Sequence, residues 1–365
     1  MTLSIHKAFT LLAISAALLL QPAKADDNRG RFGSILNQLP TSPERIVSTV
    51  PLNGDVNPYG VAFVPEGFRE GGPLEPGDIL VSNFNSFQNQ QGTGSTIVRI
   101  SRTGQLSVFF QGPSGLGLTT ALGVLKNGFV VVGNLPTMDG TSATIQAPGS
   151  LLVIDRFGNQ VANLMDASLL AGPWDLAISD RGFFAQIFVS NVLSGTVTRL
   201  DVVAGNGFKV LGETQIASGY AHRTDPNALV VGPTGLAYDE DRDLLYVAST
   251  GDNGIFAIPH AGKAMKDAGM GKLVYQDAAN LHGPLALALA PNGNLITANG
   301  DAVNPGGTQN ALVEFTPQGK FVALFQVDPG SGGGAFGLAF GGGDDSFRFA
   351  AVDDDQNTLD IWTIR

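Results

Sequence analysis

The sequence repeats one short pattern six times, and this repeat restricts the fold more than any other feature. An apolar strand with a small residue at a fixed position recurs along the chain, usually after Pro or Gly. Successive copies lie 61, 54, 60, 51 and 51 residues apart. Repeats with periods of this order are typical of solenoids, propellers and arrays. The small residues stand at Ala62, Gly123, Ala177, Ala237, Ala288 and Ala339.

Each repeat continues with further strands. A second apolar strand follows a turn and ends on a small polar residue, and a third strand comes after it. Five repeats then turn into a fourth strand, whereas the sixth ends at Arg365 before one can form. A lone strand, Arg45–Val50, precedes the first repeat. Placed beside the third strand of the sixth repeat, it would give that repeat its fourth strand.

Six four-stranded repeats predict an all-β fold, a six-bladed β-propeller with the last blade closed by an N-terminal strand. Two separate β-domains are the alternative, but they leave the sixth repeat one strand short and Arg45–Val50 without a partner. The composition fits the propeller, because 43% hydrophobic residues supply a core and 48 glycines supply turn positions. The chain has no cysteine, so its stability has to come from that core.

The N-terminus has the pattern of an export signal. Lys7 provides a positive charge, Ala8–Leu20 is an apolar run, and Ala23-Lys24-Ala25 is a small-x-small cleavage site. A buried or membrane-anchoring helix is the alternative, although the run is shorter than the roughly 20 residues that span a bilayer. We therefore expect an extracytoplasmic protein, periplasmic or secreted. The expected segments are a signal peptide (1–25), an N-terminal leader (26–43) and the propeller (44–365).

The charge balance excludes some classes of binding partner. The net charge is −11, and the sequence contains no basic run. Nucleic acids and anionic membrane surfaces both require clustered Lys or Arg, so we expect neither as a partner. We expect no integral membrane segment beyond the signal, a monomeric protein, and a small molecule, carbohydrate or peptide as the ligand.

The repeat resembles the NHL-repeat and TolB-like group of six-bladed propellers, including virginiamycin B lyase-like and gluconolactonase-like members. The matching residues are the Gly-Pro-x-x-Leu-Ala openings at Gly172 and Gly232, the hairpin Pro291–Asn294 and the strand Leu245–Ala248. The resemblance runs from about residue 44 to the end. It implies the fold, and it implies no single activity because the group contains both enzymes and binding proteins.

The residues that end the second strands form a candidate site, which we call the polar ring. In a propeller these strand ends lie around one mouth of the central channel, here called the top. Their oxygens could hold a hard cation or the polar groups of a small ligand. Alternatively, they satisfy turn amides, which is a common role of Asn and Asp. The polar ring consists of Asn83, Asn134, Asn191, Ser249, Asn299 and Asp353.

A metal ion could bind to part of this ring. Asn134, Asn191 and Asp353 are the candidate ligands, and Ca²⁺ or another divalent cation is the expected metal. The gluconolactonase-like resemblance implies a cation held by a Glu before the first strand together with Asn and Asp near the axis. Here Asn57-Pro58 occupy the position before the first strand, so that set is not matched.

Two histidines are candidates for acid–base catalysis. His222 and His282 lie in successive connections between blades on the top side, whereas His260 lies in a bottom hairpin. The first two could act as a general acid and base or as two metal ligands, and each could equally be an ordinary surface residue. The loops after the second strands are long in blades one, two and five, which predicts a cleft open on the side of blades three, four and six.

Two hypotheses for function follow. The first is an exported binding or scaffold protein that holds its ligand on the top face. The alternative is an enzyme, a divalent-metal-dependent lyase or lactonase with its site at the axial mouth and His282 or His222 as acid or base. The residues leave both open.

Overall fold

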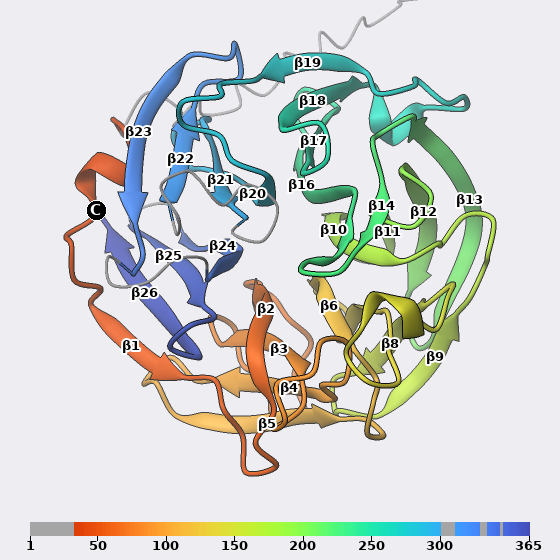
Figure 1. Cartoon of the computed structure of the whole chain (residues 1–365). Coiled ribbons are helices and arrows are strands. Elements are labelled where there is room, and N and C mark those ends of the chain that lie inside the picture. The colour runs from red at the N-terminus through yellow and green to blue at the C-terminus, as the bar shows by residue number, and fades with distance from the viewer. Residues whose placement is uncertain (1–32, 301–310, 329–333, 344–345) are drawn as a thin grey trace, which may run out of the picture.

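Six four-stranded antiparallel sheets surround a central axis in a computed structural model (Figure 1). The structure describes residues 33–300, 311–328, 334–343 and 346–365, so the expected signal peptide lies outside the described residues. In each sheet the strands follow one another from the axis outward. This arrangement confirms the six-bladed propeller.

Blades one to three contain four consecutive strands each. Blade one consists of β2 (Val56–Phe63), β3 (Ile79–Asn85), β4 (Thr96–Ile100) and β5 (Leu106–Gln111). Blade two consists of β6 (Leu118–Leu125), β7 (Phe129–Asn134), β8 (Ser150–Asp155) and β9 (Gln160–Leu164). Blade three consists of β10 (Pro173–Asp180), β11 (Phe184–Asn191), β12 (Thr196–Ala204) and β13 (Phe208–Ser218).

Blades four and five repeat this order, and blade six joins the two ends of the chain. Blade four consists of β16 (Pro233–Asp239), β17 (Leu244–Ser249), β18 (Gly254–Pro259) and β19 (Lys272–Tyr275). Blade five consists of β20 (Pro284–Leu289), β21 (Leu295–Asn299), β22 (Ala311–Phe315) and β23 (Phe321–Gln326). Blade six consists of β24 (Ala335–Gly343), β25 (Ser346–Asp353), β26 (Thr358–Ile364) and β1 (Arg45–Ser48).

The ring is closed by the N-terminal strand, as predicted. β1 pairs antiparallel with β26, with Arg45 opposite Ile361 and Ser48 opposite Thr358. The strand ends two residues before the predicted limit at Val50. Beyond it, the backbone N–H of Thr49 donates to the Asn357 carbonyl at 2.9 Å, so the pairing is extended by a loop contact.

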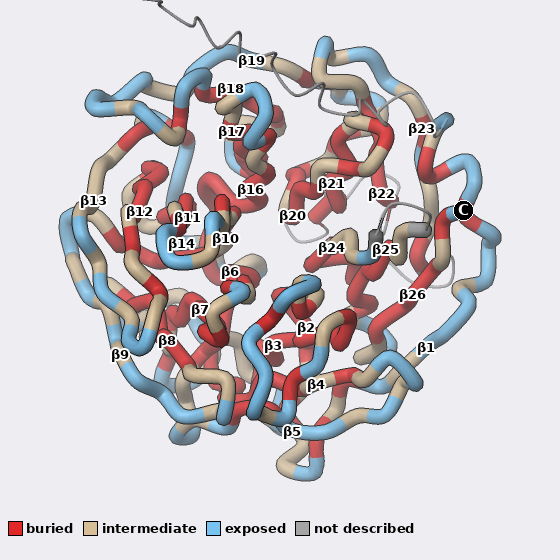
Figure 2. Tube along the Cα trace, turned by 180° about the vertical axis from the view of Figure 1, so that it is seen from behind, coloured by how far each residue is buried: buried red, intermediate tan, exposed pale blue. Residues whose placement is uncertain are grey.

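The inner strands carry small residues because they approach one another closely. A Cβ added to Gly235 would lie 2.4 Å from the Leu285 carbonyl oxygen, and one added to Gly337 would lie 2.1 Å from that of Tyr59. Such contacts are too short for any side chain. Figure 2 shows that burial follows the same geometry, with inner and middle strands mostly buried and the outer strands alternating with exposed residues.

The leader packs against the propeller, which the sequence analysis did not predict. Residues 33–40 include the short 3₁₀ helix η2 (Leu36–Gln38), which lies beside β23. Ile35, Leu36 and Leu39 are buried in a core cluster that also contains Trp362. Residues 33–40 therefore cover the outside of blades five and six, next to the closing strand (Figure 1).

Three short elements lie in the connections between strands. The connection from blade three to blade four forms an unpredicted hairpin, β14 (Arg223–Asp225) and β15 (Leu229–Val231). Two 3₁₀ helices, η3 (Ser142–Thr144) and η4 (Ala261–Lys263), lie in loops. Among the residues that the structure describes, no helix has the length and apolar character needed to cross a membrane.

Candidate functional site

A cavity of about 230 Å³, which we call the axial cup, lies at the top mouth of the channel. Inner strands of blades one, three, five and six contribute to it, as do the segments that end or follow second strands. The lining residues are Asn57, Tyr59, Asn85, Asn89, Gln91, Trp174, Asn227, Ala228, Val230, Thr250, Leu285, Gly300, Phe336 and Asp354.

The floor of the axial cup is aromatic. Tyr59 stacks on Phe84 and on Phe336, with ring centroids 4.7 Å and 4.5 Å apart. Trp174 meets Tyr59 edge to face at 5.9 Å. All four side chains are buried. Because both neighbours of Tyr59 lie parallel to it, the cluster is rigid and presents a small fixed apolar surface to the cup.

Two wall residues of the cup carry unpaired polar atoms. The Oδ1 atoms of Asn57 and Asn85 are buried and have no hydrogen-bond partner among the described residues. The amide nitrogen of Asn85 donates to Asn89 Oδ1 at 2.7 Å, which fixes the orientation of its side chain. Asn57 has φ 59°, a left-handed conformation that residues other than Gly seldom adopt. Unpaired buried acceptors are uncommon and costly, so each of these two oxygens would be stabilised by a hydrogen-bond donor.

The β14–β15 hairpin covers the side of the mouth where an open cleft was expected. Asn227, Ala228 and Val230 line the cup. The Gln91 amide donates to the Asn227 carbonyl at 3.0 Å, which links the long loop of blade one to the hairpin. Short loops after the second strands therefore do not leave blades three and four open, because the connection between these blades takes their place.

The predicted polar ring is buried, and each member makes a hydrogen bond within the fold, although the Oδ1 atoms of Asn83 and Asn191 have no partner among the described residues. Four of them hold the chain that enters their own blade, and none of the six lines the axial cup. The amide donors and their backbone acceptors are Asn83 to Thr49 (3.0 Å), Asn134 to Leu116 (3.1 Å), Asn191 to Leu169 (3.1 Å) and Asn299 to Asn280 (2.9 Å).

The other two members of the ring bond nearby. The Ser249 hydroxyl donates to Asp252 at 2.6 Å, and Asp353 accepts from the Gln356 backbone at 3.2 Å. The cup instead takes polar residues one or two positions later, at Asn85, Thr250 and Asp354. Ligand binding by the six members of the ring stays a prediction.

The two top-face histidines lie away from the cup lining. His222 is exposed, and its Nδ1 lies 3.0 Å from the Tyr220 carbonyl. His282 is half-buried, with Nε2 3.3 Å from the Ala279 carbonyl. Each ring is thus bonded within its own loop. Their catalytic role stays a prediction.

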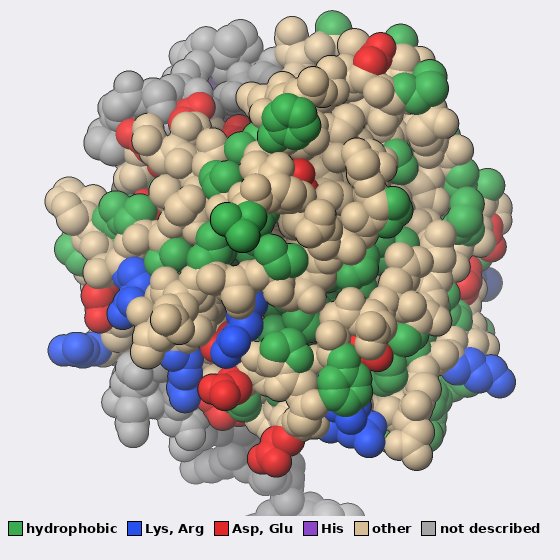
Figure 3. Space-filling view, turned by 90° about the horizontal axis from the view of Figure 1, so that it is seen from below, with side chains coloured by type: hydrophobic (Ala, Val, Ile, Leu, Met, Phe, Trp, Pro, Cys, Tyr) green, Lys and Arg blue, Asp and Glu red, His purple; other side chains and the backbone are tan. Residues whose placement is uncertain are grey.

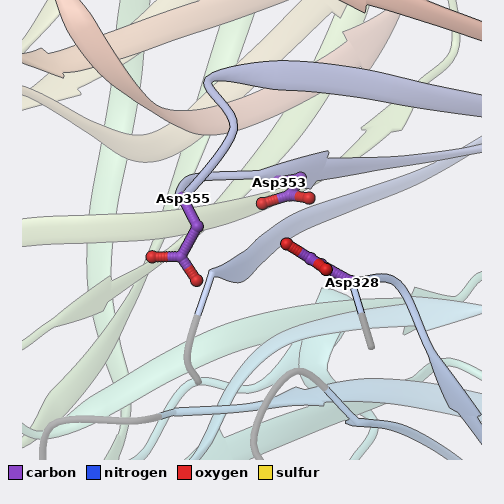
Figure 4. Close-up of side chains that lie close together, drawn as sticks. All are labelled: Asp328, Asp353 and Asp355. Atoms are coloured by element: carbon purple, nitrogen blue, oxygen red, sulfur yellow. The ribbon is translucent and has the colours of Figure 1, made fainter. Parts of the chain in front are cut away.

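Three carboxylates gather at the end of β25 (Figure 4). Oxygens of Asp328, Asp353 and Asp355 lie within 4.8 Å of one another. Burial, followed by repulsion from the other two carboxylates, raises the pKa of Asp353. Carboxylate oxygens at this spacing suit a hard cation. Of the predicted metal ligands, Asp353 belongs to this cluster, whereas Asn134 and Asn191 end strands of blades two and three.

Asp175 is a buried acid that the sequence analysis missed. It lies on β10, where its Oδ1 accepts from the Leu176 backbone at 2.7 Å and its Oδ2 from the Leu236 backbone of blade four at 3.3 Å. Burial raises the pKa of Asp175 well above its ordinary value, although both hydrogen bonds oppose the shift. The only signal in the sequence was an acid in an otherwise apolar inner strand.

The raised pKa of Asp175 predicts a pH-dependent stability. The folded protein holds this proton more tightly than the unfolded chain, so folding stability falls as the pH rises above about 4. The substitution Asp175→Asn removes the ionisable carboxyl, and with it this loss of folding stability at high pH. We expect the variant to melt a few degrees above the wild type at pH 8 and to approach it at pH 4, as measured by calorimetry.

Asp139→Asn is a control of opposite sign. Hydrogen bonds from Thr144 and Thr141 lower the pKa of Asp139, so this exposed carboxylate contributes stability above its unfolded pKa that is lost as the pH falls. Its removal should lower the melting temperature slightly at pH 8 only. A difference between Asp175→Asn and the wild type that is the same at both pH values would contradict the assignment.

Comparisons with known proteins support the fold. Searches against protein families and against curated proteins find no match. Among solved structures, the chain is similar to a gluconolactonase from Xanthomonas campestris, with 14% identity and a TM-score of 0.53, covering 88% of this chain and 90% of that one. It is also similar to a calcium-binding regucalcin from Agrobacterium tumefaciens, with 15% identity and a TM-score of 0.51, covering 89% and 95%.

A further similarity is to a streptogramin B lyase structure, with 13% identity, a TM-score of 0.49, and coverage of 88% of this chain and 87% of that one. The similarities to the gluconolactonase and the regucalcin show a shared propeller fold, as the resemblance in the sequence implied. Identities this low indicate no particular activity.

Proposed function

We propose that the protein is a binding protein whose axial cup holds a small, uncharged, hydroxyl-rich molecule about the size of one sugar ring. The observation that carries this proposal is the pair of unpaired Oδ1 atoms at Asn57 and Asn85. Ligand hydroxyls that donate to both oxygens would satisfy two buried acceptors at once. Each such acceptor costs roughly 1–3 kcal/mol when it is left unpaired.

The charge of the cup favours a neutral ligand. Asp354 is the only charged residue of the described lining, which otherwise contains amides, the hydroxyl-bearing residues Tyr59 and Thr250, and apolar groups. An anion would meet Asp354 and no Lys, Arg or His in that lining. Amides both donate and accept hydrogen bonds, which matches the two roles of a sugar or polyol hydroxyl.

The size of the cup also limits the ligand. Its volume of about 230 Å³ lies below the range of roughly 300–1,000 Å³ that is typical of pockets for drug-sized molecules. A single sugar ring fits a cavity of about 230 Å³ better than an oligomer does. Its carbon face would pack on the floor formed by Tyr59 and Phe336 while its hydroxyls reach the amides.

Calorimetric titration with a panel of neutral monosaccharides and polyols tests the proposal. We expect at least one to bind the wild type with one-to-one stoichiometry, and Asn85→Ala and Asn57→Gly to weaken it at least ~10-fold, about 1.4 kcal/mol. Glycine suits position 57 because the left-handed backbone is retained. Asn163→Ala, an exposed amide on β9, is the matched control and should change affinity less than ~2-fold.

Two results would overturn the proposal: no binding by any neutral compound, or binding that the cup substitutions leave unchanged while both variants remain folded by circular dichroism. Either would show that the unpaired oxygens do not serve a ligand of this class.

A metal-dependent lyase or lactonase is the second candidate, and the observation that favours it is the Asp328, Asp353 and Asp355 cluster beside Asp354 of the cup. A divalent cation bound there would supply polarisation of a carbonyl or lactone oxygen. Titration of the purified protein with Ca²⁺, Mn²⁺ and Zn²⁺ should then show one site, lost in Asp353→Asn. Absence of binding would remove this candidate and leave the first unaffected.

A further inference from the structure

A second cavity, which we call the basic cleft, lies at the opposite end of the propeller. It has a volume of about 630 Å³ and is lined by residues of blades one, two and six. β2 and β24 reach both cavities: Tyr59 and Phe336 line the axial cup, and Phe63 and Phe340, farther along the same strands, line the cleft. The two cavities are therefore separate.

The described lining of the cleft contains three cationic side chains, Arg102, Lys126 and Arg348, and one carboxylate, Glu66. The cations come from three different places in the sequence and meet only in the fold. The whole chain has a net charge of −11, so a cavity with an excess of cations differs from the rest of the protein. Figure 3 shows Lys and Arg side chains across the lower half of this view, interspersed with Asp and Glu.

Arg348 is held in place within the cleft. Its guanidinium lies over the Phe63 ring, 4.8 Å from the centroid, and donates to the Gly77 carbonyl. The side chain is half-buried, and burial followed by repulsion from Arg102 lowers the pKa of Arg348. An anion bound between Arg348 and Arg102 would offset the repulsion between their two positive charges and would accept hydrogen bonds from both.

Glu66 is the single carboxylate in the described lining, and it leaves the cationic excess of that lining in place. Arg102 and Glu66 lie 4.0 Å apart, and their side chains are 64% and 70% exposed. An exposed pair of this kind contributes little and is weakened by salt. Arg102 is thus able to bind another anion, and the exposed Lys126 adds a third charge on the side of blade two.

From this geometry we propose that the basic cleft binds a small molecule carrying at least two negative charges, as phosphate or carboxylate groups. Guanidinium groups match both kinds of group through paired N–H donors. The volume exceeds that of the axial cup almost threefold, so the ligand can be larger than a free inorganic ion. This proposal is independent of the function proposed for the cup.

The test is calorimetric titration with pyrophosphate and with citrate, which distinguish the two kinds of group, at low and high salt. We expect at least one of the two anions to bind the wild type at low salt. Its affinity should fall as the salt concentration rises. Arg102→Gln combined with Lys126→Gln should weaken binding at least ~10-fold. Both residues are exposed, so the double variant should keep its fold, whereas Arg348→Gln removes structural contacts and is avoided.

Two further variants sharpen the result. Glu66→Gln removes the competing carboxylate and should strengthen anion binding. Lys272→Gln combined with Lys320→Gln makes the same change in charge at exposed positions on blades four and five, and should have less than a ~2-fold effect. No binding of either anion to the wild type at low salt, or an equal loss in the control, would overturn the proposal.

Discussion

A chain that begins at residue 51 is expected to melt roughly 10 °C or more below the full-length protein and to lose cooperativity. This truncation removes β1, so blade six keeps three strands and β26 becomes an unpaired edge. It also removes Ile35, Leu36 and Leu39 from their buried positions against blades five and six. Burial of each such side chain contributes about 1.5–3 kcal/mol.

Calorimetry and binding of a hydrophobic dye measure the two effects. A chain that begins at residue 33 is the matched control, because it keeps η2 and β1 and should melt like the full-length protein. If the chain beginning at residue 51 melts at the same temperature and with the same enthalpy as this control, the closing strand contributes nothing to the stability of the ring.

The second large effect is expected from Glu314→Gln. Glu314 is fully buried on β22, and its two carboxyl oxygens accept five hydrogen bonds from the leader and the neighbouring turn. The donors are Ser34 Oγ (2.7 Å), Ile35 N (3.1 Å), Leu36 N (2.9 Å), Asn292 Nδ2 (2.8 Å) and Asn294 Nδ2 (2.7 Å).

Glutamine has the same shape but puts an NH₂ group against some of these donors. Buried donors without acceptors are costly, so we expect a loss of roughly 2–4 kcal/mol in the free energy of unfolding, measured with urea. Hydrogen exchange should accelerate at the amides of Ile35 and Leu36, which a general loss of stability would not single out.

Glu240→Gln is the control for this prediction. Glu240 pairs with Arg181 at 3.0 Å on the surface, and such pairs are worth about 0–1 kcal/mol. Unchanged exchange at Ile35 and Leu36 in Glu314→Gln would mean that the carboxyl does not hold the leader.

The propeller architecture was predictable because the same strand pattern occurs in each of the six repeats. Six copies of one strand pattern agreed, and the missing strand of the last copy matched the spare strand Arg45–Val50. The leader had no such support, since its main contact joins Ser34 to Glu314 across 280 residues. One signal was present: Glu314 is an acid within the apolar strand β22, and a buried acid needs partners.

The structure places a polar cavity at the top mouth, and the six predicted ring residues lie beside it without lining it. The top mouth does contain a polar cavity, but Asn85, Thr250 and Asp354 line it, and Asn83, Ser249 and Asp353 do not. At a strand end, a shift of one residue turns a side chain to the opposite face, and a shift of two moves it roughly 7 Å farther along the strand. The hairpin that covers the mouth was missed because β14 and β15 contain only three residues each.

The sequence by itself determined the number of blades, the order of their strands and the closure of the ring, because these depend on periodic patterns that local chemistry repeats along the chain. The tertiary structure decided which polar atoms remain unpaired in the axial cup, which acids are buried, and that Arg102, Lys126 and Arg348 surround one cleft. Those features depend on distances between residues far apart in sequence, which only the closed ring fixes.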